Sequence, residues 1–106
     1  MLVALRDDLT AELAATRVAL DDLRRERADR FDDDEHDPEG LPLSAEWSRL
    51  DGRRWVTERR ITEADEALAN AAAGRYGVCL VCGRPIPAGR LEARPTATRC
   101  VVCAAR

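Results

Sequence analysis

The sequence RYGVCLVCGRPIPAGRLEARPTATRCVVCAAR, from Arg75 to Arg106, decides the fold of this 106-residue chain. It contains all four cysteines of the protein, as two C-x-x-C pairs with 17 residues between them. The four are Cys79, Cys82, Cys100 and Cys103. This spacing is typical of a zinc site, and four thiolates complete the tetrahedron of a structural zinc ion without an open position for water or substrate. We therefore predict one zinc ion per chain, held by these residues in a domain spanning residues 75–106.

The residues around the two pairs fit this prediction. Gly77 and Gly83 flank the first pair and supply the backbone freedom that lets amide N–H groups turn toward the sulfur atoms. Four thiolates on one divalent ion leave a net charge of about −2, which nearby arginines can offset. These arginines are Arg75, Arg84, Arg90, Arg94 and Arg99. Because so short a segment has little apolar core, metal binding is expected to supply most of its folding free energy, on the order of 10 kcal/mol.

Other uses of four cysteines fit less well. Two disulfides require an oxidising compartment, and the opening residues MLVALRDDLT lack the pattern of a signal peptide. A thioredoxin-like redox pair requires a βαβ context around one C-x-x-C motif, for which there is no room. An iron–sulfur cluster also takes four cysteines, but two knuckles joined by a short ribbon favour zinc. Oxidation of the zinc thiolates with release of the metal stays open as a form of regulation.

The first 74 residues have the pattern of two long helices. Residues 2–30 contain no proline or glycine, and a second helix is predicted from Ser44, a good N-cap, to about Ala73, with Gly74 as the stop. In both segments, seam residues recur at steps of three and four. The first stripe is Leu2, Leu5, Leu9, Leu13, Thr16, Leu20 and Leu23. The second is Trp47, Leu50, Arg54, Thr57, Ile61, Ala64, Leu68 and Ala71, and we expect Trp55 and Val56 to widen the contact.

Neither stripe is stable in water without a partner. The two segments are of similar length, so we predict an antiparallel two-helix coiled coil over residues 1–74, followed by the four-cysteine zinc finger. The fold class is therefore mainly α. The composition agrees, because 35% of the residues are charged and 18 of the apolar residues are alanine, which favours thin helices over a thick core. No apolar run approaches the ~20 residues needed to cross a bilayer, so we expect a cytoplasmic protein without membrane association.

The predicted loop between the helices, residues 31–43, carries much of the negative charge. Its acidic residues are Asp32, Asp33, Asp34, Glu35, Asp37 and Glu39, and without these six the formal net charge would change from −3 to +3. Such a block can be merely a solvated surface. It does not fit an EF-hand calcium site, because Pro38 occupies the position of the sharp-turn glycine, although weak magnesium association stays open. A charged tip held ~40 Å from the metal is also suited to reaching into a partner.

The cysteine-containing segment resembles a known family. The run GVCLVCG from Gly77 to Gly83, the segment RLEARPTA from Arg90 to Ala97, and the pair Cys100-x-x-Cys103 are similar to the zinc finger of the DksA/TraR proteins, bacterial regulators that bind RNA polymerase. The resemblance covers about the last third of the chain. It implies that the coiled-coil tip enters the secondary channel of RNA polymerase. There its acidic residues would act near the catalytic magnesium, with the alarmone ppGpp as a candidate ligand at the interface.

The chain departs from the family at two places. The family's tip pattern is Asp-x-x-Asp-x-Ala, and here Asp37 matches it whereas Gly40 and Pro42 occupy the positions of the second aspartate and the alanine. We also predict no helix of useful length after Cys103, so contacts of that helix, including part of a ppGpp site, are not carried over.

We expect a monomeric transcription regulator that is not an enzyme. The sequence has no nucleophile–base pair, no phosphate-cradling glycine loop and no open metal site. The alternative function is a zinc-ribbon module that binds nucleic acid or serves as a protein adaptor. Direct DNA binding is not expected, because the chain is acidic and no exposed aromatic platform is predicted.

Overall fold

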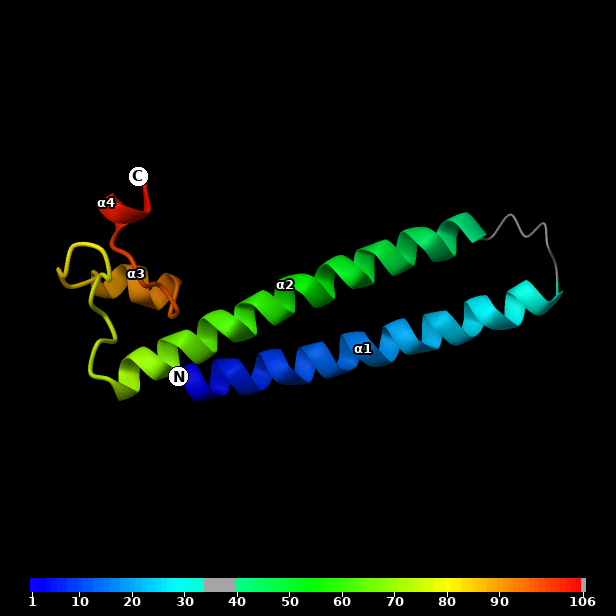
Figure 1. Ribbon diagram of the computed structural model, residues 1–106, viewed down its shortest axis with the longest axis horizontal. Coiled ribbons are helices and arrows are strands. Elements are labelled where there is room, and N and C mark those ends of the chain that lie inside the picture. The colour runs from blue at the N-terminus through cyan, green and yellow to red at the C-terminus, as the bar shows by residue number, and fades with distance from the viewer. Residues whose placement is uncertain (34–39, 106) are drawn as a thin grey trace. The chain divides into compact units, whose positions relative to one another are not determined.

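The protein is built from two long helices and two short ones (Figure 1). This computed structural model describes residues 1–33 and 40–105, and the side chains of residues 1–29 and 44–105. The helices are α1 (Leu2–Asp33), α2 (Gly40–Ala72), α3 (Ala88–Ala93) and α4 (Val101–Ala104). Within the described ranges the only β-type pairing is an isolated bridge between Val78 and Pro85. The mainly α fold class is confirmed, and none of the described helices is long and apolar enough to cross a membrane.

The contacts of the chain form two compact units, Met1–Asp7 together with Ile61–Arg106, and Asp8–Arg60. In the first unit, the start of α1 packs on the end of α2. Arg6 forms an ion pair with Asp65, and Ala64 of α2 is completely buried. The predicted domain division at residue 74 stays a prediction.

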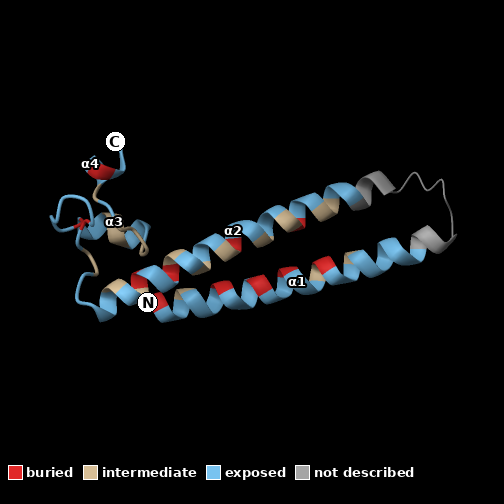
Figure 2. Ribbon diagram, viewed as in Figure 1, coloured by how far each residue is buried: buried red, intermediate tan, exposed pale blue. Residues whose placement is uncertain are grey.

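In the unit Asp8–Arg60, α1 and α2 run antiparallel, as predicted. Arg17 Nη2 of α1 lies 3.4 Å from Glu58 Oε1 of α2, and the Arg24 guanidinium lies 5.6 Å from the centre of the Trp47 ring. Arg24 comes after Arg17 in α1, whereas its partner Trp47 comes before Glu58 in α2, so the two helices run in opposite directions. The ribbon positions of the buried residues of this unit lie on the facing sides of the two helices (Figure 2). These residues are Leu9, Leu13, Thr16, Leu20, Leu50 and Thr57.

The predicted stripe of α1 is confirmed, since all seven residues are buried or half-buried. The stripe of α2 is correct up to Leu68, but Ala71 is exposed and Ala67 is buried instead. With Arg6 paired to Asp65, the antiparallel register leaves no residue of α1 opposite Ala71. The expectation for Trp55 and Val56 is wrong, because they are 55% and 50% exposed. At about 100° per residue, Trp55 points roughly 140° away from Leu50 around the helix.

The predicted helix ends are partly wrong. α1 continues to Asp33, and α2 begins at Gly40 rather than after an N-cap at Ser44, so helix occupies both ends of the predicted loop 31–43. Pro42 does not prevent this start, because its fixed φ suits a helix and the first-turn N–H groups have no intrahelical partner.

The predicted stop at Gly74 is confirmed. Gly74 has a φ of 74°, a conformation that favours glycine. Its N–H donates to Ala71 O at 3.1 Å, and the Arg75 N–H donates to Asn70 O at 2.7 Å. This pair of bonds is the Schellman motif, which satisfies carbonyl groups left over at a helix end.

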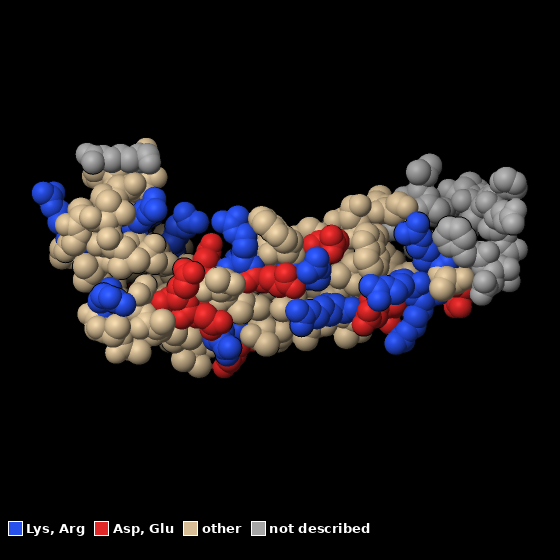
Figure 3. Space-filling model, in the orientation of Figure 1, with Lys and Arg blue, Asp and Glu red and all other residues tan. Residues whose placement is uncertain are grey.

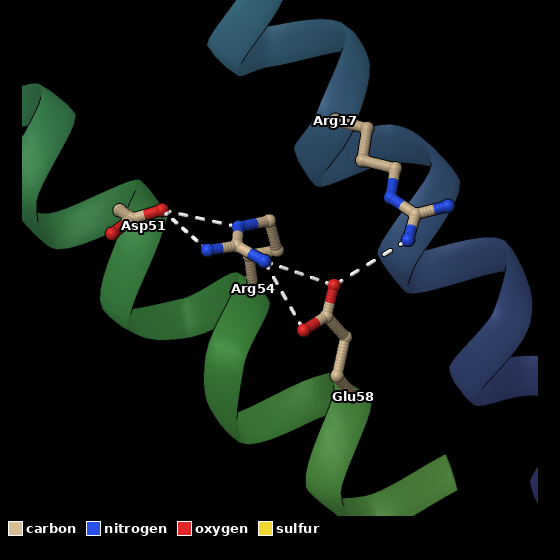
Figure 4. Close-up of polar contacts among 4 residues, drawn as sticks. All are labelled: Arg17, Asp51, Arg54 and Glu58. Carbon is tan, nitrogen blue, oxygen red and sulfur yellow. Dashed lines mark hydrogen bonds and ion pairs between the residues drawn. The ribbon is translucent and has the colours of Figure 1, made fainter.

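A polar network joins the two helices of the unit Asp8–Arg60 (Figure 4). Arg54, predicted in the seam, is half-buried and donates to Asp51 Oδ1 through Nε and Nη2 at 3.0 and 2.9 Å. Its Nη1 donates to both carboxylate oxygens of Glu58 at 3.0 and 3.1 Å, and Glu58 Oε1 also accepts from Arg17. Each such pair contributes at most about 1 kcal/mol. The network therefore orients the helices more than it stabilises them.

Candidate metal centre and acidic tip

The four predicted ligand residues come together in the described part of the chain. The sulfur atoms of Cys79, Cys82, Cys100 and Cys103 all lie within 4.8 Å of one another. The distance from Cys82 Sγ to Cys100 Sγ is 3.8 Å. A tetrahedral site with Zn–S bonds of about 2.3 Å has sulfur–sulfur edges of about 3.8 Å, so the spacing fits a zinc ion. All four cysteines are free thiols. A metal site requires free thiols, whereas the alternative of two disulfides requires sulfur atoms bonded in pairs.

The first pair is shaped by its flanking glycines. Gly77 and Gly83 have φ values of 81° and 75°, which confirms the predicted need for glycine. The Cys79 N–H donates to Arg84 O at 2.8 Å, and the Gly83 N–H donates to Cys79 O at 2.9 Å. These short-range bonds close the turn that carries both sulfur atoms.

A small apolar core supports the cysteines. Cys79, Ile86 and Cys103 are buried together, and Leu91 packs against them. Leu91 belongs to α3, so the connection between the two pairs contains a helix, and the predicted ribbon is wrong. Sequence reasoning did not assign Ile86 and Leu91 a role, although apolar residues in so charged a segment are a signal for a core.

Two side-chain hydrogen bonds link the segment before the second pair to earlier parts of the finger. Tyr76 Oη donates to Pro95 O at 2.9 Å, and Arg90 Nε donates to Arg99 O at 2.8 Å. The sequence analysis singled out Arg90 for its charge, and the structure gives it a structural contact as well. Arg84, which was expected to offset the thiolate charge, lines a groove together with three of the cysteines.

The local environment shifts the pKa values of the cysteine thiols in different directions. The backbone N–H of Cys82, and then that of Cys100, lower the pKa of Cys79 to about 6. The pKa of Cys100 is lowered, chiefly by the backbone N–H of Cys103. In contrast, the hydrogen bond to Cys100 and burial raise the pKa of Cys103 to about 12. Cys79 therefore favours the thiolate at neutral pH, whereas Cys103 holds a proton that a metal must displace.

These pKa shifts predict a pH dependence of zinc binding. Because Cys103 gives up a proton to the solvent when zinc binds, we expect the affinity to fall by at least about tenfold for each unit that the pH is lowered near neutrality. Below about pH 6 the fall should steepen, since Cys79 is then protonated as well. Competition with a chromophoric chelator between about pH 5 and 8 measures this. An affinity that does not change over that range would contradict the assignment.

The acidic tip stays a prediction. Asp32 and Asp33 lie on the last turn of α1, where the backbone but not the side chains is described. Asp34, Glu35, Asp37 and Glu39 lie outside the described residues.

Comparison with known proteins connects both parts of the chain to one family. Residues 74–106 match the family model described as the prokaryotic dksA/traR C4-type zinc finger. The RNA polymerase-binding transcription factor DksA of Caulobacter vibrioides is 51% identical over 41 residues, which cover 39% of this chain and 29% of that protein. An uncharacterized protein of Haemophilus influenzae is 56% identical over 39 residues, covering 37% of this chain and 49% of that protein.

The structural likeness extends further than the sequence likeness. The transcription factor DksA2 of Pseudomonas aeruginosa matches with a TM-score of 0.82 and 28% identity, over 99% of this chain and 75% of that one. The sequence matches span less than a third of the Caulobacter protein and about half of the Haemophilus protein. The family model and the four-cysteine cluster together indicate zinc binding.

Proposed function

Because the chain belongs to the DksA/TraR family, we propose that it regulates transcription by binding RNA polymerase. The observation that carries this proposal is the likeness to DksA2 over 99% of the chain, combined with the clustered cysteines. The name of the Caulobacter relative, an RNA polymerase-binding transcription factor, supports the same partner. We further propose that the protein acts as a monomer in the cytoplasm.

The metal in this proposal is structural. Cys79, Cys82, Cys100 and Cys103 hold one zinc ion, which cross-links the two ends of the finger. Four thiolates leave no coordination position for water or substrate, so the site supports no hydrolytic chemistry. What this chain supplies is the pair of turns and the core residues that aim the sulfur atoms at one point.

The acidic tip is the proposed working end. The part of α1 from Asp8 to Asp33 rises about 39 Å at 1.5 Å per residue, long enough to reach down a narrow channel. It leads directly into the run of six acidic residues between 32 and 39. Carboxylates delivered beside a magnesium ion can compete with its ligands or reposition groups around it. We propose that this is how the tip acts in the secondary channel of RNA polymerase.

Direct binding to DNA is the weaker candidate. On the helical part of the face shown in Figure 3, basic and acidic side chains are interspersed, whereas DNA binding favours a surface of one sign. One expectation behind this ranking is wrong, because Trp55 is an exposed aromatic side chain. However, the Arg59 guanidinium lies 5.3 Å from the centre of its ring, on the surface that a base would need for stacking.

A ppGpp site at the polymerase interface is proposed only because the chain resembles the DksA/TraR family. A hollow of about 360 Å³ is lined by Arg90, Arg94 and Arg99. Glu63 and Glu66 of α2 line the same hollow, and their carboxylates oppose a polyphosphate. We therefore propose that regulation by this chain depends only weakly on ppGpp.

Neutralising the tip tests the function. We expect a variant with Asn or Gln at the six acidic positions 32–39 to keep its affinity for core RNA polymerase within about threefold but to lose its effect on promoter-complex lifetime. Asp8→Asn with Asp21→Asn, two exposed positions of α1, is the matched control and should behave like the wild type. Each protein is assayed with and without ppGpp.

The outcomes separate the parts of the proposal. Failure of the wild-type chain to bind core polymerase would reject the function as a whole. A neutralised tip that still changes promoter-complex lifetime would reject only the tip. A large effect of ppGpp on the wild type would reject the weak dependence inferred from Glu63 and Glu66.

A further inference from the structure

A groove of about 480 Å³ borders the proposed zinc site, since three of the four cysteines line it. Besides Arg84 and three of the cysteines, its lining residues are Pro85, Pro87, Val101 and Val102. Val101 and Val102 belong to α4 and are 58% and 64% exposed. Cys103 of the same short helix is buried in the core, so the two valines are turned away from it. Apolar side chains gathered in an exposed groove are typical of an interaction surface.

The charge around the groove limits its occupant. Residues 75–105 contain five arginines and one acidic residue, Glu92. A second copy of the chain docked in the groove would bring one arginine-rich module against another, which like-charge repulsion disfavours. A partner that presents carboxylates beside an apolar side chain complements both the valines and Arg84. The groove is thus suited to an acidic protein surface with an aliphatic anchor.

We propose that the groove lined by Pro85, Pro87, Val101 and Val102 receives an aliphatic side chain of RNA polymerase, while a neighbouring polymerase carboxylate pairs with Arg84. This proposal rests on the proposed function, because it names the same partner. It assigns the zinc-finger end a direct contact with polymerase, in addition to a role as the base of the helices. A few residues in a well-packed, desolvated pocket, arginine often among them, supply most of the affinity in such interfaces.

Substitution of Val102 tests the groove. We measure the affinity of the zinc-loaded full-length chain for core RNA polymerase. Val102→Asp should weaken binding by about tenfold or more, because it places a carboxylate in an apolar contact and repels the acidic partner. Val102→Ile should keep the affinity within about twofold. The matched control is Val3→Asp, which lies on α1 before the part proposed to enter the channel; the valine is similarly exposed at 60% and should tolerate the change.

Measuring the zinc content shows whether the Val102→Asp variant still folds, and crosslinking identifies what occupies the groove. If Val102→Asp lowers the zinc content, then Arg84→Glu and a photo-crosslinking residue at position 102 replace it as the test. The crosslink should form to a polymerase segment that contains a carboxylate, and the same residue at position 3 should not form it. Equal binding of wild type and Val102→Asp, or a crosslink only to a second copy, would overturn the groove proposal alone. If the wild type does not bind polymerase, the proposed function falls with it.

Discussion

Replacing Cys79 by serine should remove zinc and unfold residues 75–105. Cys79 is only 1% exposed and belongs both to the sulfur cluster and to the small core with Ile86. Three remaining thiolates bind zinc far more weakly, and metal binding in such modules is worth on the order of 10 kcal/mol of folding free energy. The core that would remain is too small to replace that contribution. Metal analysis should give about one zinc ion per chain for the wild type and almost none for the variant.

The control for this experiment lies in the same turn. Val81→Ser changes a residue between Cys79 and Cys82 that is 63% exposed, so it should keep both zinc and structure. Amide hydrogen exchange should then show loss of protection over residues 75–105 in Cys79→Ser only. Full zinc content in Cys79→Ser would show that this cysteine is not a ligand.

The second large effect is expected in the helical hairpin. Leu9→Ala should lower the free energy of unfolding by about 2–4 kcal/mol, since Leu9 is 3% exposed and its removal leaves a cavity between α1 and α2. Because the hairpin interior is only one layer of side chains thick, few neighbours can close that cavity. Chemical denaturation followed by circular dichroism measures the change.

Val18→Ala is the matched control for the hairpin. It truncates a residue of the same helix that is 59% exposed and should change the stability by at most about 0.5 kcal/mol. Equal effects of Leu9→Ala and Val18→Ala would mean that the leucine stripe is not the interface between the helices.

The cysteine turns were predictable because their geometry is local. A C-x-x-C pair with Gly77 and Gly83 beside it contains nearly all the atoms that shape the turn, and the structure shows the positive φ values that this pattern requires. Periodicity likewise predicted the stripe of α1 in full. Tip residues 34–39 lie outside the described residues, so their role stays a prediction.

Two sequence predictions, the start of α2 and the position of Trp55, are wrong because another local feature had the larger effect. Pro42 and Ser44 indicate a helix start at Ser44, yet α2 begins at Gly40, because a proline in the first turn of a helix removes no hydrogen bond. Trp55 was expected to widen the contact from a position beside the seam, but its angular position on α2 places it in solvent. In both cases residue type was given more weight than position.

The sequence by itself determined the two long helices, apart from their ends, and the two cysteine turns, because these depend on spacing along the chain. Only the tertiary structure decided how the turns meet. Hydrogen bonds from Tyr76 Oη to Pro95 O and from the Leu80 N–H to Thr98 O connect the first turn to the segment that leads into the second pair. The same packing buries Cys103 and leaves Val102 exposed beside it. No periodic pattern encodes that choice, since it depends on which side of a four-residue helix faces the core.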